Sequence, residues 1–402
     1  MSMDRFGDKV CCNPNVKLKK QESYPVIDID KITPGYKAVR SVASIEYTGQ
    51  GGAKFQDHDV LFARITPCLE NGKMAIADTE GQNGIGSTEL FVFRGIDGVS
   101  DTDYVYYLLC MKHIRQLAAN SMTGASGRQR ADLDFIKRIQ WDFPDIEMQK
   151  KIASVLSAYD NLIEVNNKRI DFLEQIAENL YKEWFVRFRF PGHETAEFEN
   201  GIPEGWAYRR ADEVIDFNPT LKTGNQTEFT IIPMEALSTN SMVLDSGCFV
   251  RQDSISGRRS QNGDTLLAKI TPCLENGKTG FVMGMPENEV LGGSTEFVVM
   301  RSKALTPHYV YCIARSYYFR QTAILSMNGA DGRQRVDEDK LKSTKILQPE
   351  KTVLDHFETI VTPIFDGVYQ MVQENKNLIQ QRDLLLPRLM SGKLEVQYAL
   401  ND

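Results

Sequence analysis

The sequence predicts an α+β fold in which two similar mixed α/β domains are separated by two long helices. Three observations lead to this prediction. The chain of 402 residues repeats itself once, each copy opens with short strand-like apolar runs, and each copy closes with a long heptad pattern. A chain of this length is too long for one typical core and suits two or more domains.

Composition places the chain among soluble globular proteins, with 42% hydrophobic and 25% charged residues. No apolar run is long enough to span a bilayer, and residues 1–20 lack the apolar stretch of a signal peptide, so we expect a cytoplasmic protein. Seven cysteines without a C-x-x-C pair predict neither a disulfide framework nor a zinc site. The net charge of −7 is unusual for a nucleic-acid-binding protein, so any such role depends on local basic clusters.

The internal repeat has an offset of 205 residues. Residues 63–73 (ARITPCLENGK) and 268–278 (AKITPCLENGK) agree at ten of eleven positions. Asn-Pro, Tyr-Val-Tyr and M-x-G-A-x-G-R-Q-R motifs recur at the same offset, and a Gly-Ser-Thr-Glu motif recurs at an offset of 207. Two copies of one fold are therefore predicted, as a pseudo-two-fold molecule facing a partner with two similar sites.

The first part of each copy predicts a mixed α/β region. Residues 60–65 and 265–270 are apolar strand candidates, each followed by Thr-Pro and an Asn-Gly turn. Further strands are expected at 74–77 and 280–283 and at 90–93 and 297–300. Apolar residues at helical spacing from Tyr104 to Ala118 predict one helix ending near Met122, and a loop carrying Arg128 and Arg130 follows.

The last part of each copy predicts a helix of about 35–40 residues, or roughly 50–60 Å at 1.5 Å per residue. A long helix with only one apolar stripe needs a partner that covers this stripe, and the simplest partner is the long helix of the other copy. The alternative is that each helix packs on its own domain. Tyr159 falls on the first stripe, Arg382 interrupts the second, and Pro387 and Gly392 are expected to end the second helix. The predicted seam comprises Ile163, Asn166, Ile170, Leu173, Leu180, Ile364, Val368, Met371, Asn375 and Leu378.

Four stretches together resemble the specificity subunits of type I restriction-modification systems. Residues 149–185 (QKKIASVLSAYDNLIEVNNKRIDFLEQIAENLYKEWF) are similar to the family's central helical region. Residues 201–206 (GIPEGW) are similar to the entry of its second recognition domain, and 381–394 (QRDLLLPRLMSGKL) to its C-terminal helical region. The order of recognition domain, helix, recognition domain, helix is also that of the family. The N-terminal entry departs from the pattern, because residues 1–10 contain no counterpart of Trp206.

The resemblance implies target recognition domains at 1–146 and 191–349 and conserved helices at 147–190 and 350–402. It implies that the helices form an antiparallel coiled coil that sets the distance between two readers of a split double-stranded DNA target. It further implies binding to two methyltransferase subunits, which use S-adenosylmethionine, and to a separate restriction subunit with ATP-driven activity. No cofactor is expected on this chain itself.

The duplicated Gly-Arg-Gln-Arg loops are the leading candidates for DNA contact, because Arg grips phosphate or guanine and Gln can pair with adenine. A feature present in both copies can equally be scaffold, since the two halves of such a target usually differ. The candidates are Arg128, Gln129, Arg130, Arg333, Gln334 and Arg335.

Other basic residues near the repeated turns are Arg64, Lys269, Lys73 and Lys278, each of which either meets phosphate or is a solvated surface charge. Base discrimination is expected where the copies differ, at 36–54 and 237–259. The second segment contains Arg251, Arg258 and Arg259, and residues 251–278 carry five basic and three acidic residues.

Catalytic signatures are missing from the sequence. Asn13-Pro14 and Asn218-Pro219 are not followed by the Pro-aromatic pair of an amino-methyltransferase, and the five histidines are scattered. A non-catalytic DNA-binding adaptor is therefore predicted. The alternatives are a detached part of a fused methylase-nuclease and a protein-only scaffold that pairs two partner subunits.

Overall fold

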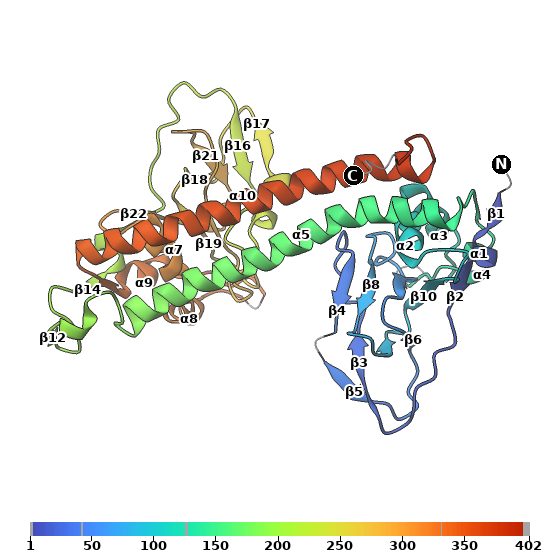
Figure 1. Ribbon diagram of the computed structural model, residues 1–402. Coiled ribbons are helices and arrows are strands. Elements are labelled where there is room, and N and C mark those ends of the chain that lie inside the picture. Colours follow the sequence, from blue (N-terminus) through green and yellow to red (C-terminus); the bar gives the residue numbers. More distant parts are fainter. Residues whose placement is uncertain (1–2, 42, 125–127, 331, 397–402) are drawn as a thin grey trace, which may run out of the picture. The chain divides into compact units, whose positions relative to one another are not determined.

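The structure is a computed structural model that describes residues 3–41, 43–124, 128–330 and 332–396. The chain divides into two compact units. Unit 1 comprises Met1–Val165 and Asn375–Asp402, and unit 2 comprises Asn166–Glu374. Each unit contains one mixed α/β region and part of each of two long helices, α5 (Ile146–Tyr181) and α10 (Lys351–Met390), which are green and red in Figure 1.

Unit 1 contains a five-stranded sheet in the order β2-β10-β7-β8-β4. Its neighbouring strands are antiparallel except β8 and β4, which are parallel. Val60–Ala63 is buried along its whole length, as the unbroken apolar run predicts for a central strand. The bounds are β2 (Val10–Cys12), β10 (Leu90–Gly95), β7 (Val60–Ala63), β8 (Met74–Asp78) and β4 (Ala38–Arg40).

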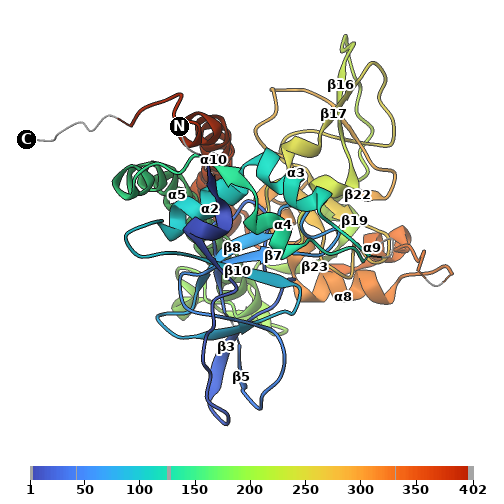
Figure 2. The same ribbon diagram turned by 90° about the vertical axis from the view of Figure 1, so that its right-hand side faces the viewer.

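A second, four-stranded sheet of unit 1 has the order β5-β3-β9-β6, and its central pair β3 and β9 is parallel. Phe55 fills the space above Gly84, where a Cβ atom would lie 2.3 Å from the ring, so this strand position requires glycine. Figure 2 shows β3 and β5 side by side. The bounds are β5 (Ser44–Glu46), β3 (Ser23–Ile27), β9 (Gly84–Gly86) and β6 (Ala53–Phe55), with a separate pair β1 (Asp4–Arg5) and β11 (Gln140–Trp141).

Unit 2 contains two four-stranded sheets, in the orders β15-β22-β19-β20 and β17-β16-β21-β18. Strand by strand, these orders match those of unit 1 without the edge strand β4. The first sheet comprises β15 (Ile215–Phe217), β22 (Phe297–Ser302), β19 (Thr265–Ala268) and β20 (Thr279–Phe281). The second comprises β17 (Val250–Gln252), β16 (Phe229–Ile232), β21 (Leu291–Gly293) and β18 (Arg258–Ser260). Two further pairs are β12 (Phe198–Glu199) with β13 (Ile202–Pro203), and β14 (Ala207–Arg210) with β23 (Lys345–Gln348).

The expected helix from Tyr104 to Ala118 is in fact two helices. Asp101 caps the first by accepting a hydrogen bond from the backbone of Tyr104, and Met111 has an extended ψ of 125° that interrupts the helix. The apolar spacing continues across the break, because both helices pack on the same core. Unit 2 repeats this arrangement. The bounds are α2 (Thr102–Cys110), α3 (Lys112–Asn120), α7 (Pro307–Arg315) and α8 (Tyr317–Leu325).

Shorter helices complete both units. Their bounds are α1 (Phe6–Lys9), α4 (Leu133–Lys137), α6 (Ala211–Val214) and α9 (Glu338–Ser343), with 3₁₀ turns at His193–Thr195, Met234–Ala236 and Ser246–Cys248.

The expected end of the second long helix is also corrected. Pro387 lies inside α10, which continues to Met390, and Gly392 follows in a left-handed conformation with φ of 69°. The buried residues Leu386, Leu389 and Met390 belong to the core of unit 1, so their packing explains why the helix continues past the proline.

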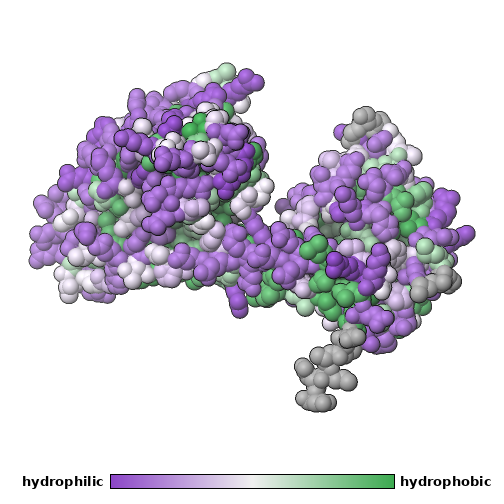
Figure 3. Space-filling model, turned by 90° about the horizontal axis from the view of Figure 1, so that it is seen from above, coloured by the Kyte–Doolittle hydropathy of each residue, from purple (hydrophilic) through white to green (hydrophobic). Residues whose placement is uncertain are grey.

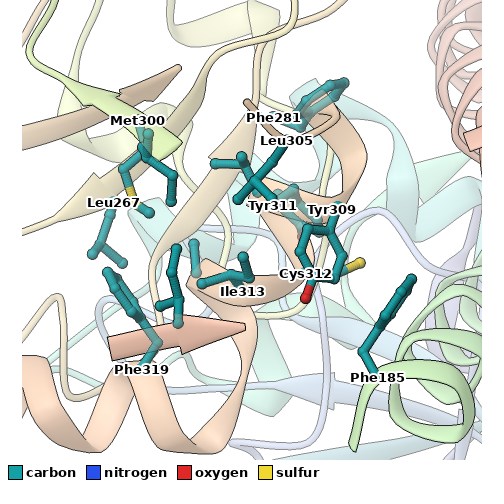
Figure 4. Packing of buried hydrophobic residues seen from close by; sticks show 14 of the residues in the cluster. Phe185, Leu267, Phe281, Met300, Leu305, Tyr309, Tyr311, Cys312, Ile313 and Phe319 are labelled. Atoms are coloured by element: carbon teal, nitrogen blue, oxygen red, sulfur yellow. The ribbon is translucent and has the colours of Figure 1, made fainter. Parts of the chain in front are cut away.

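The aromatic end of α5 belongs to the core of unit 2. A π-helical turn, Lys182–Val186, presents Trp184 and Phe185 to the core. The ring centroid of Phe185 lies 5.9 Å from that of Trp206 and 4.5 Å from that of Tyr309. Through Trp206, the GIPEGW motif therefore packs against the end of this long helix. Figure 4 shows Tyr309 between Phe185 on one side and the sheet residues Leu267 and Met300 on the other.

Candidate nucleic-acid interface

The two Gly-Arg-Gln-Arg loops are fixed to the Thr-Pro turns by backbone hydrogen bonds. The backbone nitrogen of Thr66 donates to the carbonyl oxygen of Gln129 at 3.0 Å, and that of Gln129 donates to Thr66 Oγ1 at 3.1 Å. In unit 2, Thr271 and Gln334 make the same two bonds. The repeated glutamines therefore occupy backbone-pinned positions beside cis prolines 67 and 272.

The second arginine of each loop forms a bidentate ion pair with the glutamate of the Gly-Ser-Thr-Glu motif. Arg130 donates from Nε and Nη2 to Glu89 at 2.8 and 2.5 Å, and Arg335 pairs with Glu296 at 2.7–3.0 Å. Hydrogen bonds from these guanidinium groups lower the pKa of both glutamates. The Gly-Arg-Gln-Arg and Gly-Ser-Thr-Glu motifs, which recur together in the sequence, therefore contact each other in both units. This contact favours a structural role for Arg130 and Arg335.

The first arginine of each loop is exposed. Among the residues that the structure describes, Arg128 and Arg333 have no ion-pair or side-chain hydrogen-bond partner. Residues 125–127 and Asp331, which belong to the same loops, lie outside the described residues. Arg128 and Arg333 are therefore the loop arginines whose guanidinium groups are available to a phosphate.

Arg64 and Lys269 occupy equivalent positions but have different surroundings. The Arg64 guanidinium lies 4.7 Å from the centre of the Phe91 ring, and its Nε is buried with no hydrogen-bond partner among the described residues. Lys269 Nζ instead lies 2.9 Å from Glu338 Oε1, which also accepts from Arg258 at 2.8 Å. Two of the predicted basic residues of unit 2 thus share one carboxylate.

Glu338 was missed in the sequence, although the comparison of the two copies contains a signal for it. The equivalent residue in the first copy is Leu133, where no carboxylate can pair with Arg64. Glu338 Oε2 also accepts from Asn218 at 2.8 Å, so one glutamate fixes three side chains. Arg64 is the member of this pair for which the described residues provide no carboxylate at ion-pair distance.

The remaining predicted basic residues contact nearby backbone or carboxylate groups. Lys73 donates to the carbonyl of Ile29 at 2.9 Å, and Lys278 donates to that of Met234 at 3.1 Å. The other two are Arg251, which pairs with Glu289 at 3.3 Å, and Arg259, which donates to the carbonyl of Leu221 at 2.5 Å. These contacts orient all four side chains without excluding a further contact to phosphate.

A lysine-rich loop of unit 1 was also missed. Lys17, Lys19 and Lys20 are exposed between the Asn13-Pro14 turn and β3. Unit 2 carries only Lys222 in the corresponding segment. The signal in the sequence is the run K-L-K-K directly after the repeated Asn-Pro motif.

The long helices contact each other inside each unit. In unit 2, Ile170 and Val368 share one core, and Asn166 Nδ2 donates to Glu374 Oε2 at 3.0 Å. Of the predicted seam, Ile163, Asn166, Ile170, Val368 and Asn375 are buried, whereas Leu173, Leu180, Ile364, Met371 and Leu378 are half-buried.

Two residues of the seam differ from the prediction. Tyr159 is only half-buried, and the neighbouring Asp160 is buried in its place. Arg382 does not simply interrupt the seam, because its Nη1 lies 2.5 Å from Asp160 Oδ1 within unit 1. Asp160 also accepts a short hydrogen bond from the hydroxyl of Tyr107.

The described residues include no group of three or more metal-ligating side chains that could hold an ion. None of the helices in the described ranges is long and apolar enough to cross a membrane.

Comparison with known proteins identifies the class of this chain. A family model described as the type I restriction modification DNA specificity domain matches residues 10–175. The MjaIX specificity subunit of a type I restriction enzyme from Methanocaldococcus jannaschii is 25% identical over 319 residues, which cover 76% of this chain and 72% of that protein. The MjaVIII specificity subunit from the same organism is 23% identical over 419 residues, covering 98% and 92%.

A solved structure agrees in fold. The crystal structure of a type I restriction-modification S subunit from M. genitalium matches with a TM-score of 0.55 and 14% identity, covering 96% of this chain and 95% of that one. This chain therefore shares its mixed α/β fold with long helices with that structure. Residues 10–175 match the specificity domain of type I restriction-modification systems, and two specificity subunits align over most of this chain, which confirms the resemblance found in its motifs. The specificity subunits that this chain resembles are non-catalytic recognition subunits, in agreement with the predicted non-catalytic role.

Proposed function

We propose that this chain reads a bipartite DNA sequence on behalf of a type I restriction-modification complex. Each unit reads one half of the target, and α5 and α10 form an antiparallel coiled coil that sets the distance between the halves. The observation that carries the proposal is the repeated strand order of the two units, combined with surface segments that differ between them. Two related readers with different loops suit two different half-sites.

Arg128 and Arg333 are proposed to bind phosphate, because they are exposed and lie on loops pinned at equivalent places in both units. Arg64 and the lysine-rich loop at Lys17, Lys19 and Lys20 add positive charge on unit 1. Base readout is assigned to the segments that differ, 36–54 and 237–259. Such contacts let a chain of net charge −7 bind DNA locally.

The partners that we propose are two methyltransferase subunits and a restriction subunit. S-adenosylmethionine and ATP are assigned to those partners, and this chain is proposed to hold no cofactor. α5 exposes four large apolar side chains, Leu162, Val165, Phe172 and Ile176, at intervals close to the heptad repeat. Such a stripe is suited to bind further helices. Binding to chromosomal DNA implies that the complex works in the cytoplasm.

The phosphate contacts can be tested by salt titration of DNA binding with the methyltransferase-bound chain. Arg128→Ala with Arg333→Ala should weaken binding and make the slope of log K against log salt shallower by about 2, because each phosphate contact contributes about 0.9. The exposed arginines Arg209 and Arg388 serve as the control pair, and their replacement by alanine should leave the slope unchanged. An unchanged slope in the first variant contradicts the assignment.

The bipartite target can be tested by mapping methylated adenines in cells that express the complete system. Exchanging residues 237–259 for those of a relative should change one half-site and leave the other intact. Methylation without a split motif contradicts the proposal and favours a scaffold that only pairs its partners.

A further inference from the structure

Arg251 of unit 2 is an exposed arginine that a buried carboxylate holds in place. It lies on the edge strand β17, and its side chain is 56% exposed. Its Nη1 donates to Glu289 Oε1 at 3.3 Å, and the side chain of Glu289 is only 9% exposed. The same oxygen accepts a hydrogen bond from Thr230 Oγ1 at 2.8 Å, and Thr230 is buried. The guanidinium group is therefore anchored at one nitrogen and otherwise open to solvent.

Glu289 is itself held by the residues around it. The side chain of Gln226 bonds both backbone groups of the adjacent Val290, because its Oε1 accepts from the nitrogen at 2.9 Å and its Nε2 donates to the oxygen at 3.3 Å. Val290 is also buried. A side chain whose support is fixed by packing and hydrogen bonds keeps its partner in a defined orientation. Glu289 therefore limits the directions in which Arg251 can point.

The contribution of this pair to stability does not explain its presence. Glu289 Oε2 is buried and has no hydrogen-bond partner among the described residues. A buried acceptor without a partner costs free energy, and an ion pair with a largely exposed arginine compensates little of that cost. Proteins keep such arrangements mainly at functional sites. The pair of Arg251 and Glu289 is therefore a candidate for a functional contact.

The first copy of the repeat has different side chains at the three equivalent positions. The strand registers and the offset of 207 assign the counterparts of Thr230, Arg251 and Glu289 as Pro25, Ser44 and Gln82. None of the three counterparts is charged, so the fold forms this part of the sheet without the arginine and its anchor. Two readers of different half-sites are expected to differ where they contact bases.

The sheet face that carries Arg251 also carries Arg258. The registers along the order β17-β16-β21-β18 place both side chains on one face, at the two edge strands. Arg258 pairs with Glu338, which follows the Gly-Arg-Gln-Arg loop by three residues. Arg251 therefore faces the same side of this sheet as the residues around that loop.

The surface next to Arg251 is polar. The three residues that follow it, Gln252, Asp253 and Ser254, are all exposed, and all are of types that bond base edges. Figure 3 views the molecule from the side on which β16 and β17 lie in Figure 1, and the surface there is mainly hydrophilic. These side chains are suited to polar contacts in a groove of DNA.

The free edge of the guanidinium group indicates which base it fits. The bond from Nη1 leaves Nε and Nη2 of Arg251, which share one edge, without a partner among the described residues. Two parallel donors match O6 and N7 of guanine in the major groove, and no other base presents two adjacent acceptors there. A phosphate contact, by contrast, is satisfied by a flexible cation and gains little from a buried anchor.

We propose that Arg251 reads a guanine in the half-site of unit 2, and that Glu289 is the positioning residue that orients its guanidinium group. This inference rests on the proposed function, in which unit 2 reads one half-site through residues 237–259. Thr230 supports the contact by bonding the same carboxylate oxygen. Unit 1 lacks this contact, because Ser44 occupies the position of Arg251.

The test measures methylation rates with the purified complex of the full chain and its methyltransferase subunits. The substrates are DNA duplexes that carry the motif found by methylated-adenine mapping, with each guanine replaced in turn by the other bases. The wild-type complex should discriminate about tenfold or more against replacement of the guanine that Arg251 reads. Arg251→Ala and Arg251→Lys should both reduce this discrimination at least about fivefold, because neither forms the bidentate contact, and should leave the other half-site unchanged.

Glu289→Gln tests the positioning role. The variant keeps the shape and an acceptor for Thr230 but loses the charge that orients Arg251. It should relax the preference at the same guanine, and it should have no further effect when added to Arg251→Ala, because Glu289 acts through Arg251. A purely structural role would instead lower the rate on all duplexes independently of Arg251.

Arg210→Ala is the matched control. Arg210 forms an ion pair with Asp212 at 2.8 Å in the same unit, and its side chain is also well exposed. Its replacement should leave every base preference at the wild-type value. Circular dichroism should show that all variants keep the wild-type helix content.

Several outcomes overturn the inference. An unchanged base preference in both Arg251 variants contradicts it, and so does a wild-type motif without guanine in either half. If Arg251→Ala only made the salt dependence of binding shallower and Arg251→Lys behaved as wild type, Arg251 would be a phosphate contact. Loss of methylation on all duplexes in the Arg251 and Glu289 variants, but not in Arg210→Ala, would assign the pair to folding. In each of these cases a bipartite motif still supports the proposed function, which itself fails if the wild-type system has no such motif.

Discussion

The ion pair of Asp160 and Arg382 fixes the two long helices against each other within unit 1. Both side chains are buried, and Arg382 also donates to the carbonyl oxygen of Gly35 at 3.3 Å. The repeat replaces Asp160 by Phe365 and Arg382 by Ala177 in the other copy. If α5 paired with the α5 of a second chain at the same register, Asp160 would lie opposite Ala177, the equivalent of Arg382, and would have no counter-ion. The Asp160–Arg382 ion pair therefore favours the contact of α5 with α10 over a contact of α5 with a second α5.

Removing one partner of this pair should destabilise unit 1 more than removing both. Arg382→Leu leaves a buried carboxylate unpaired and should cost about 3–5 kcal/mol, whereas Asp160→Leu with Arg382→Leu should lie near the wild-type stability. Urea unfolding followed by circular dichroism measures both. Equal losses in the single and double variants would show that the pair does not act as a unit.

The cluster of His58, Asp103 and Lys37 predicts a pH dependence in unit 1. A hydrogen bond with Asp103 raises the pKa of His58 above its usual 6.5, against an opposing effect of burial. A raised histidine pKa stabilises the fold below about pH 6.5, and this contribution is lost as pH rises through the pKa of the folded state. His58 is 58% exposed, so solvent screening limits the effect to less than about 1 kcal/mol.

This dependence can be measured by thermal unfolding of wild-type and His58→Gln chains between pH 5.5 and 8.5. The stability difference between them should be largest at the acidic end and vanish at the alkaline end. A difference that does not change with pH would exclude protonation of His58 as its origin.

At the scale of secondary-structure elements, the short strands and the long helices lie where the local sequence patterns predict them. The apolar runs at 60–65 and 265–270 became the central strands β7 and β19, each a little shorter than expected. Two predictions about helix boundaries were wrong, because local sequence patterns do not include tertiary contacts. The break at Met111 is invisible to periodicity because both helices face one core, and Pro387 is tolerated because the residues around it are buried.

α10 contains a glycine whose replacement should stabilise the helix. A Cβ atom on Gly367 would meet Leu173 Cδ1 at 3.7 Å, an ordinary contact, and alanine in a helix is about 1 kcal/mol more favourable than glycine. Gly367→Ala should therefore raise the unfolding free energy by up to about 1 kcal/mol in urea titrations.

Gly257→Ala is the matched control for this prediction. Gly257 has a φ of 73°, and a Cβ atom there would lie 1.8 Å from the carbonyl oxygen of Gly293, so this variant should lose stability. If Gly367→Ala lowered the stability as Gly257→Ala does, α10 and α5 would have to pack more closely at this position than the 3.7 Å contact indicates.

At the scale of the whole molecule, the proposed spacer can be shortened by one heptad in both helices. Deleting residues 163–169 of α5 and 371–377 of α10 removes the Asn166–Glu374 contact and keeps the Asp160–Arg382 pair. At 1.5 Å per residue the spacer loses about 10 Å, or roughly three base pairs at 3.4 Å each. Methylated-adenine mapping should show the two half-sites unchanged and the gap between them about three base pairs shorter.

The control for this experiment is the deletion of only one of the two segments. It shifts the helices by a heptad against each other, so the Asp160–Arg382 pair and the packing of Ile170 with Val368 can no longer form together, and it should abolish assembly. An unchanged gap after the double deletion would show that α5 and α10 do not set the spacing.

The amino-acid sequence by itself determined the duplication, the long helices and the resemblance to specificity subunits, because all three depend on residue order and periodicity. It also identified the Gly-Arg-Gln-Arg loops, but it did not separate their two arginines. Only the tertiary structure decided that Arg130 and Arg335 are held by Glu89 and Glu296, whereas Arg128 and Arg333 remain exposed. The partner of a charge is often distant in sequence, and whether that charge is neutralised depends on which residues the fold brings within a few ångströms.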